Sequence, residues 1–207
     1  ITFEARFNIE SLNGSGDAQI NTVMGIEKKF LLRVDVHKNG NNNGERFLQL
    51  SADDKGGIRY EGLTRIETNR WYDVAVVLDD SKSGSDRIAL YVNGKKETLQ
   101  LSNGEPDKLK EVDLTSNFFI GQSDGKRRLN GAISYARIWT TALSDEQITV
   151  QSGKILNEDK DGLIANWLFN NGNGNTKTFV SLAEKSFEAE AANVVSTWKA
   201  DPILTVE

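Results

Sequence analysis

Short stretches of alternating or continuous apolar residues recur along this chain, and clusters of Gly, Asn and Asp separate them. Alternation with a period of two is typical of strands with one buried face, and the clusters are typical of turns. The pattern predicts strands at 2–9, 20–27, 30–36, 47–51, 57–61, 71–78, 88–92, 96–101, 117–121, 132–139, 163–169, 178–182 and 187–192. Because one sheet does not comfortably hold so many strands, we expect two packed antiparallel sheets, as in a jelly roll.

The clearest local signal is a hairpin between the strands at 88–92 and 96–101. Asn93 and Gly94 stand between them, and both residue types readily adopt the positive φ that a type I′ turn requires. We therefore expect these two strands to pair directly.

The strand at 132–139 is followed by a change of period. Its alternation predicts one face made by Ile133, Tyr135 and Arg137, with Ser134 on the opposite face. This opposite face also includes the small and aliphatic residues of the strand.

A helix is indicated directly after this strand. Ser144 and Gln147 have the spacing of a capping box, and Leu143 and Ile148 have that of a hydrophobic staple. The sequence therefore predicts one short helix near 144–152 in an otherwise all-β chain, and capping accounts for its polar residues.

Composition narrows the class of protein. The chain has 207 residues and a formal net charge of −5. A sandwich of this length is commonly one unit, so we predict a single domain over 1–207. The chain begins inside a strand pattern, without Met or signal peptide, so we expect it to be part of a longer protein. The negative charge disfavours nucleic acid as a partner, and no stretch approaches the roughly 20 apolar residues of a membrane span.

Two residue types limit the available chemistry. The sequence has no cysteine, which excludes disulfides, thiolate nucleophiles and sulfur-ligated zinc. His37 is the single histidine, and it adjoins an Asn/Gly-rich loop without a Gly-x-Ser-x-Gly elbow, so a Ser-His-Asp triad is not predicted.

Four motifs follow one another between residues 71 and 148: RWYDVAVVLDD, IALYVNGK, FFIGQS and RLNGAISYARIWTTALSDEQI. In this order and spacing they resemble the laminin G-like domains of the concanavalin A-like lectin/glucanase superfamily. The later stretch DGLIANWLFNNGNGN is similar to a strand that such domains often carry near one terminus. The resemblance implies a concanavalin A-like jelly roll whose short helix lies across one end of the sandwich.

Catalytic members of this superfamily share a carboxylate motif that can be sought in this sequence. Laminarinase-type glycoside hydrolases place two Glu and one Asp on one strand as E-x-D-x-E or E-x-D-x-x-E, so that the carboxylates share a face. The nearest approach here is Glu105, Asp107 and Glu111, but the spacing differs and Pro106 interrupts it. We therefore expect a charged loop and no catalytic activity.

Calcium is the one candidate ion, and otherwise we expect no cofactor. Asn157, Asp159 and Asp161 copy the first ligand positions of an EF-hand loop, whereas the acid required at position 12 falls on Leu168. A full EF-hand is thus excluded, and a looser oxygen cage is the remaining alternative to a plain acidic turn. Laminin G-like domains commonly carry an acid where this chain has Ser134, so their calcium site is not implied here.

Loops at the rim of a sheet carry most binding residues in proteins. The Asn-rich loop after His37 and the strand next to the 53–57 turn are therefore our candidate ligand surface. Its predicted residues are His37, Asn41, Asn42, Asn43, Arg59 and Tyr60. Three of the four tryptophans lie in apolar strand patterns and are expected in or near the core: Trp71, Trp139 and Trp167.

The resemblance implies a non-catalytic carbohydrate-binding or interaction module of an extracellular or cell-surface glycan-handling protein, of the kind found in Gram-negative bacteria. We expect a glycan or a neighbouring domain as partner, and an upstream segment as the outer-membrane anchor. A structural spacer or docking domain for a neighbouring catalytic or β-sandwich domain is the alternative. A glycoside hydrolase with non-sequential acids is a third and less favoured one.

Overall fold

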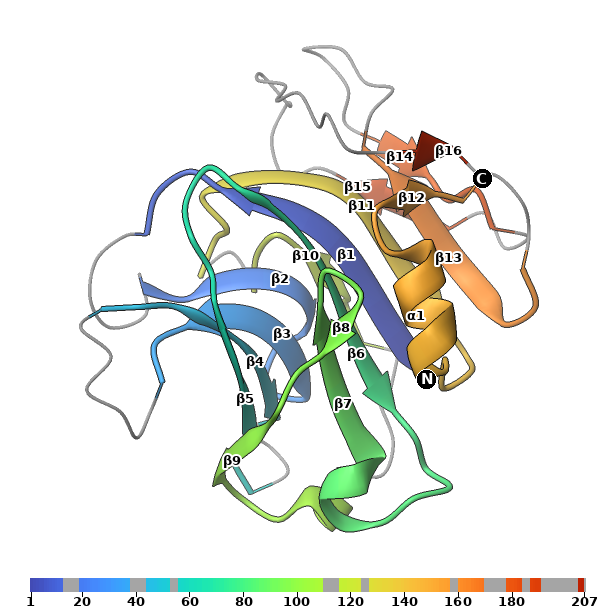
Figure 1. Ribbon diagram of the computed structural model, residues 1–207. Coiled ribbons are helices and arrows are strands. Elements are labelled where there is room, and N and C mark those ends of the chain that lie inside the picture. Colours follow the sequence, from blue (N-terminus) through green and yellow to red (C-terminus); the bar gives the residue numbers. More distant parts are fainter. Residues whose placement is uncertain are drawn as a thin grey trace.

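A computed structural model of the protein shows two large sheets packed against each other, with one α-helix outside them (Figure 1). The structure describes residues 1–12, 19–37, 44–52, 56–109, 116–123, 127–156, 160–169, 178–183 and 187–190, and the backbone of 205–206. The predicted all-β jelly-roll sandwich with one short helix is confirmed.

The first sheet has six antiparallel strands in the order β13-β11-β1-β6-β7-β8. Their bounds are β13 Leu163–Leu168, β11 Gly131–Trp139, β1 Thr2–Ile9, β6 Trp71–Leu78, β7 Ile88–Val92 and β8 Lys95–Lys96. The first strand, β1, lies between β6 and β11, which follow it by about 70 and 130 residues, so this sheet forms only when distant segments meet.

The second sheet also has six strands, in the order β10-β2-β3-β4-β5-β9. Their bounds are β10 Phe119–Ile120, β2 Asn21–Ile26, β3 Phe30–Asp35, β4 Phe47–Ala52, β5 Ile58–Arg65 and β9 Gln100–Asn103. The remaining elements are α1 Asp145–Gln151, the parallel pair β12 Lys154–Ile155 and β16 Thr205–Val206, the antiparallel pair β14 Thr178–Val180 and β15 Glu188–Glu190, and the 3₁₀ turns η3 Gly84–Arg87 and η4 Pro106–Lys108.

The predicted hairpin is confirmed, but the strand predicted at 96–101 is wrong. Asn93 and Gly94 have φ of 52° and 74°, as a type I′ turn requires. After β8 the chain leaves the first sheet and joins the second sheet as β9, which pairs with β5. Glu97 stabilises this crossing, because its carboxylate accepts the N–H groups of Leu63 and Thr64 in β5 at 2.8 and 2.7 Å.

Apolar side chains from both sheets fill the space between them. They include Phe3, Phe7, Val23, Leu32, Leu48, Leu50, Ile58, Val74, Val76, Leu90 and Ile138. Trp139 and Trp167 are buried, and Trp71 is partly exposed, which agrees with the expected positions in or near the core.

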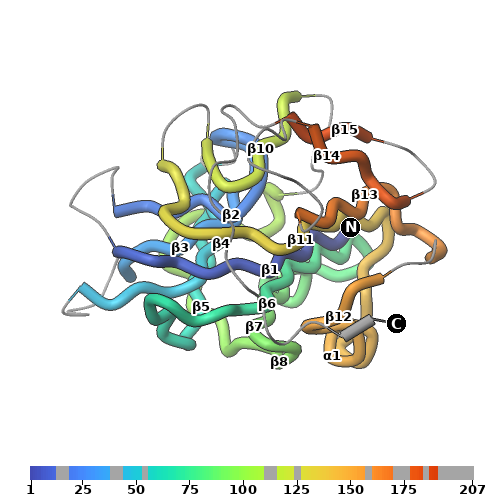
Figure 2. Tube along the Cα trace, turned by 90° about the horizontal axis from the view of Figure 1, so that it is seen from above, coloured from blue at the N-terminus to red at the C-terminus, as the bar shows by residue number. Residues whose placement is uncertain are grey.

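Helix α1 packs on the outer face of the first sheet, on the side away from the second sheet (Figures 1 and 2). Its capping box is confirmed, since the Ser144 hydroxyl accepts the Gln147 N–H and the Gln147 side chain accepts the Ser144 N–H. Leu143 and Ile148 are both buried in one apolar cluster with strand residues of the outer face. The Thr149 hydroxyl also donates to the Gly94 carbonyl at 2.8 Å, which ties the helix to the β7–β8 turn.

A β-bulge in β11 changes which residues face the helix. Arg6 pairs with Tyr135 but Phe7 pairs with Ile133, so Ser134 is the extra residue. Ile133 therefore turns toward the core, and the prediction that it shares a face with Tyr135 and Arg137 is wrong.

Charged residues occupy the centre of this outer face and are buried there. Arg6 forms a hydrogen-bonded ion pair with Asp73, whose other oxygen accepts the Tyr135 hydroxyl at 2.6 Å. Arg137 lies 3.8 Å from the Glu4 carboxylate and directly over the Tyr135 ring. The two guanidinium side chains are at most 2% exposed, so each depends on its counter-charge inside the protein.

Asp73→Asn is expected to lower the free energy of unfolding by about 3 kcal/mol, because it leaves the buried Arg6 guanidinium without a counter-charge. Urea unfolding followed by fluorescence measures this loss. Glu67→Gln is the matched control, since Glu67 belongs to an exposed pair with Arg70, and we expect it to cost less than about 0.5 kcal/mol. Similar losses in the two variants would contradict the role given to Asp73.

Glu4 should give the stability of the protein a distinct pH dependence. Its carboxyl is fully buried, and burial raises its pKa above the ordinary carboxyl range, although Arg137 and the Trp139 N–H oppose this shift. The folded protein therefore holds this proton more tightly than the unfolded chain. The stability that comes from Glu4 is fully present below the ordinary carboxyl pKa and is lost as pH rises through the raised pKa of the folded state.

We expect Glu4→Gln, which cannot titrate, to gain stability relative to the wild type as pH rises from about 4 to about 8. Urea unfolding of both proteins over a pH series measures this gain, and the other carboxyl groups cancel in the comparison. A difference in unfolding free energy that stays constant over the series would contradict the raised pKa of Glu4.

Candidate functional site

Of the predicted ligand surface, the structure describes His37, Arg59 and Tyr60. Asn41, Asn42 and Asn43 lie outside the described residues, and His37 follows the end of β3. Alternation along β5 turns Arg59 outward and Tyr60 inward, where the Tyr60 ring is 1% exposed and belongs to the core between the sheets. Burial also raises the pKa of the Tyr60 hydroxyl. The Tyr60 ring therefore faces the core and not the predicted ligand surface, because its place in the alternation points it inward.

The His37 ring makes a hydrogen bond and a stacking contact within the protein. Its Nε2 lies 2.8 Å from the Gly62 carbonyl oxygen, and its ring stacks on Phe47 with 3.7 Å between the centroids. The ring thus connects the end of β3 to β4 and β5, and these contacts use both its face and one of its nitrogens.

A polar row crosses the outer face of the second sheet, close to His37. Arg33, Gln49 and Glu61 are direct cross-strand neighbours on β3, β4 and β5. The Gln49 amide donates to the Val36 carbonyl at 2.6 Å and to the Glu61 carboxylate at 3.1 Å, and Arg33 pairs with Asp35 at 3.3 Å. Arg33, Gln49 and Glu61 are at most 3% exposed, so this row contacts protein groups rather than solvent.

Two acids of the near-match to a glycosidase motif, Glu105 and Asp107, make contacts with other protein groups. Asp107 accepts the Gly84 N–H at 2.7 Å, and Glu105 pairs with Lys108 at 3.2 Å around η4. Glu111 lies outside the described residues. The two described acids thus hold a turn together, in agreement with the charged loop that the sequence predicts.

The calcium prediction stays open. Asn157 and Asp159 lie outside the described residues, whereas Asp161 lies in the turn before β13. Within the described ranges, His, Cys, Asp and Glu side chains do not gather in any group of three that could hold a metal ion.

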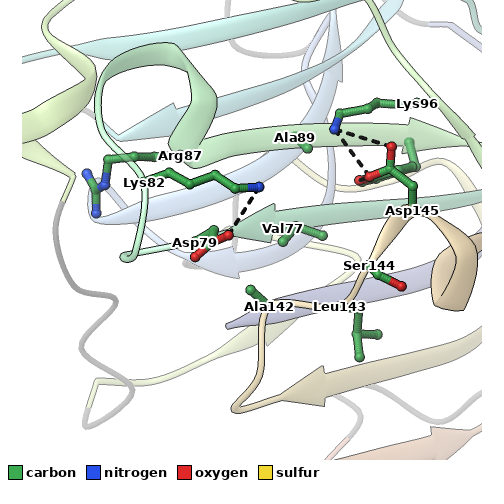
Figure 3. A pocket seen from close by; sticks show the side chains of 11 residues that line it. Val77, Asp79, Lys82, Arg87, Ala89, Lys96, Ala142, Leu143, Ser144 and Asp145 are labelled. Carbon is green, nitrogen blue, oxygen red and sulfur yellow. Dashed lines mark hydrogen bonds and ion pairs between the residues drawn. The ribbon is translucent and has the colours of Figure 1, made fainter.

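A cavity of about 400 Å³ opens on the outer face of the first sheet, next to the start of α1 (Figure 3). Its apolar lining comes from Val77 in β6, Ala89 in β7 and Leu143 before the helix. Val77 and Leu143 belong to the apolar cluster that holds the helix, and Ala89 packs against it. The packing of the helix therefore also fixes these walls of the cavity.

Two Lys–Asp pairs flank this apolar lining (Figure 3). Lys82 and Asp79 come from the β6–β7 connection, with 3.2 Å between Nζ and Oδ2. Lys96 of β8 lies 3.2 Å from Asp145, the first residue of α1. Each pair places a hydrogen-bond donor next to an acceptor at the edge of the cavity.

Hydrogen bonds keep both acids of the cavity ionised. The Tyr91 hydroxyl donates to Asp145 at 2.7 Å and lowers the pKa of that carboxyl, while burial and, to a smaller extent, this contact raise the pKa of Tyr91. Hydrogen bonds from the Ser81 side chain and backbone lower the pKa of Asp79. A general acid needs the opposite shift, so these carboxylates are suited to binding rather than to proton transfer.

Sequence reasoning missed this cavity because its polar residues come from three separate segments without a motif. The sequence predicts a loop at 79–86, and an acid such as Asp145 is common in the first turn of a helix. The sequence did predict both the hairpin that ends at Lys96 and the helix that begins near Asp145. The structure packs α1 against β8, which brings Lys96 and Asp145 together.

Comparison with known proteins places the chain in a family. Residues 1–149 match a laminin G-like family described as the concanavalin A-like lectin/glucanases superfamily. No curated protein matches the sequence. The described part of the chain contains no helix long and apolar enough to cross a membrane.

Solved structures with the same fold include several carbohydrate-binding domains. A proposed carbohydrate binding protein from Bacteroides ovatus is 25% identical with a TM-score of 0.66, over 87% of this chain and 48% of that one. This chain therefore spans about half the length of that protein.

Two more distant structures share the fold alone. A heptameric SAP-like pentraxin from Limulus polyphemus is 18% identical with a TM-score of 0.53, over 73% of this chain and 68% of that one. The CBM40 of the Ruminococcus gnavus IT-sialidase is 13% identical with a TM-score of 0.51, over 73% and 82% of the two chains. With its two-sheet sandwich and its match over residues 1–149, the chain belongs to the laminin G-like branch of the concanavalin A-like lectin/glucanases superfamily.

Proposed function

We propose that this chain is a non-catalytic carbohydrate-binding module that holds a sugar residue in the cavity beside α1. The observation that carries this proposal is an apolar lining, Val77 and Ala89, between two Lys–Asp pairs. A volume of about 400 Å³ lies within the range of small-molecule sites, about 300 to 1,000 Å³. The likeness to the proposed carbohydrate binding protein from Bacteroides ovatus supports the same function.

The chemistry of the cavity matches that of a pyranose ring. A sugar presents C–H groups on its ring faces and hydroxyl groups around its edge, so it needs an apolar surface surrounded by donors and acceptors. The partly exposed Ala89, with the buried Val77 beside it, supplies the apolar surface, and the Lys and Asp side chains supply the donors and acceptors. Because three of these four polar side chains are about half exposed or more, we expect weak binding of a single sugar, in the millimolar to micromolar range.

In the intact protein, this module would direct a glycan-handling machinery to its substrate outside the cell or at the cell surface. The partner would be a glycan, with or without calcium at the 157–161 turn. The second sheet near His37 and Arg59 is the alternative location for binding, and the partly exposed Arg59 side chain permits a direct test.

A docking domain is the second candidate, and one observation favours it. Three apolar side chains near β14 and β15 are about half exposed: Val180 at 52%, Leu182 at 47% and Phe187 at 46%. Exposed apolar groups of this size commonly mark contacts with another domain or protein. A chain that binds no glycan would therefore point to this surface.

We expect Lys96→Ala to weaken sugar binding at least about tenfold, because it removes a charged donor from the cavity. A glycan array followed by calorimetry on the best ligand, with calcium and with chelator, measures binding of the wild type and variant. Arg59→Ala should bind like the wild type, and thermal unfolding checks that both variants are folded. Loss of binding in Arg59→Ala alone would move the site to the second sheet, and no binding by any protein would refute the proposed function.

A further inference from the structure

We infer that the cavity beside α1 selects a neutral sugar through vicinal hydroxyl pairs, one at each of two edges of the ring. This inference rests on the proposed function and names the class of its ligand. It follows from the charge balance of the cavity and from the spacing of donor and acceptor within each Lys–Asp pair.

The charges that line the cavity are balanced locally. Lys82 has Asp79 as its counter-charge and Lys96 has Asp145, each at 3.2 Å. The third cation of the lining, Arg87, pairs with Asp80, and Figure 3 shows its guanidinium pointing away from the two Lys–Asp pairs. The groups that face a ligand therefore carry no excess positive charge.

An acidic sugar gains little in such a site. A uronate carboxylate that approaches Lys82 or Lys96 also approaches Asp79 or Asp145, and like charges repel at short range. It would have to separate an existing ion pair to obtain a cation of its own. The hydrogen bonds that Ser81 and Tyr91 donate keep both Asp side chains ionised, so this repulsion persists in mildly acidic solution.

A vicinal diol, in contrast, fits a Lys–Asp pair without breaking it. Neighbouring hydroxyl oxygens of a pyranose lie about one hydrogen-bond length apart, similar to the distance between the Lys nitrogen and the Asp oxygen. One hydroxyl can donate to the carboxylate while its neighbour accepts from the ammonium group. Tyr91 donates to Oδ1 of Asp145, and Lys96 donates to both carboxylate oxygens, at 3.2 and 3.4 Å. Because a carboxylate oxygen has more than one lone pair and the Asp145 side chain is 65% exposed, a ligand hydroxyl can still donate to it.

The two pairs stand on different sides of the apolar lining, which fixes how a ring must lie. Lys82 with Asp79 and Lys96 with Asp145 flank Val77 and Ala89 (Figure 3). A pyranose that rests one face on these apolar side chains directs hydroxyl groups toward both pairs at once. A ring without hydroxyl pairs on two edges contacts only one of them.

The decisive variant removes one pair without changing net charge. We expect Asp79→Asn with Lys82→Met to weaken binding of a neutral free hexose, the monosaccharide of the best array ligand, at least about tenfold, because its four ring hydroxyls form two vicinal pairs. Glu105→Gln with Lys108→Met is the matched control, because it removes an equally short exposed pair at 3.2 Å outside the cavity. Calorimetry at low and high salt gives the affinities, and thermal unfolding shows that both double variants are folded.

The ligand series completes the test. The wild type should bind the neutral free hexose at least about tenfold more tightly than the corresponding uronate, and its affinity should change less than about twofold with salt, since no net charge is neutralised. A monodeoxy analogue that lacks one hydroxyl of a vicinal pair should lose about tenfold. Tighter binding of the uronate, with a steep fall in salt, would overturn the inference while the proposed function stands. The absence of binding for every sugar would refute both.

Discussion

The arrangement of this protein depends on burying charged side chains on the outer face of a β-sheet. Arg6, Asp73, Glu4 and Arg137 stand where a sandwich usually meets solvent, yet all four are nearly or fully buried. Removing the counter-charge of a buried guanidinium strongly destabilises a protein. Asp73 and Glu4 supply the charges, and the Lys154 carbonyl, just beyond α1, accepts from Arg137. The helix and the segment after it are thus the cover of a charged surface.

This cover explains why an all-β chain contains one well-capped helix. The helix is only two turns long, so its intrinsic stability is small and its packing must hold it in place. Ile148 and Leu143 anchor it in the apolar cluster, and Thr149 binds the β7–β8 turn. The cavity lies at the edge of the cover, where the helix begins and the sheet is no longer shielded. Its walls are consequently held by the same contacts that protect the buried charges.

Local patterns predicted most of the fold, and the incorrect predictions concern features that depend on long-range contacts. Alternation located the long strands, and Asn93 with Gly94 located the hairpin, because these signals lie within a few residues. The bulge at Ser134 depends on pairing with β1, more than 120 residues away, and the crossing after Lys96 depends on Glu97 reaching β5. The site was predicted from loop composition, which does not tell whether a ring such as Tyr60 points inward. Lys96 carried no signal, because its partner Asp145 is 49 residues away in the sequence. Lys82 and Asp79 are three residues apart, but nothing in this polar segment distinguishes them from an ordinary loop.

The polar residues on the outer faces of the two sheets differ in their remaining capacity for hydrogen bonds. On the second sheet, Arg33, Gln49 and Glu61 bond to one another and are shielded from solvent. At the cavity, the Lys–Asp pairs keep free donors and acceptors because their side chains are substantially exposed. Polar groups that are already satisfied inside a protein gain nothing from a ligand, whereas exposed pairs exchange water for it at little cost. A polar residue type alone therefore does not locate a binding site in this fold; its remaining hydrogen-bonding capacity does.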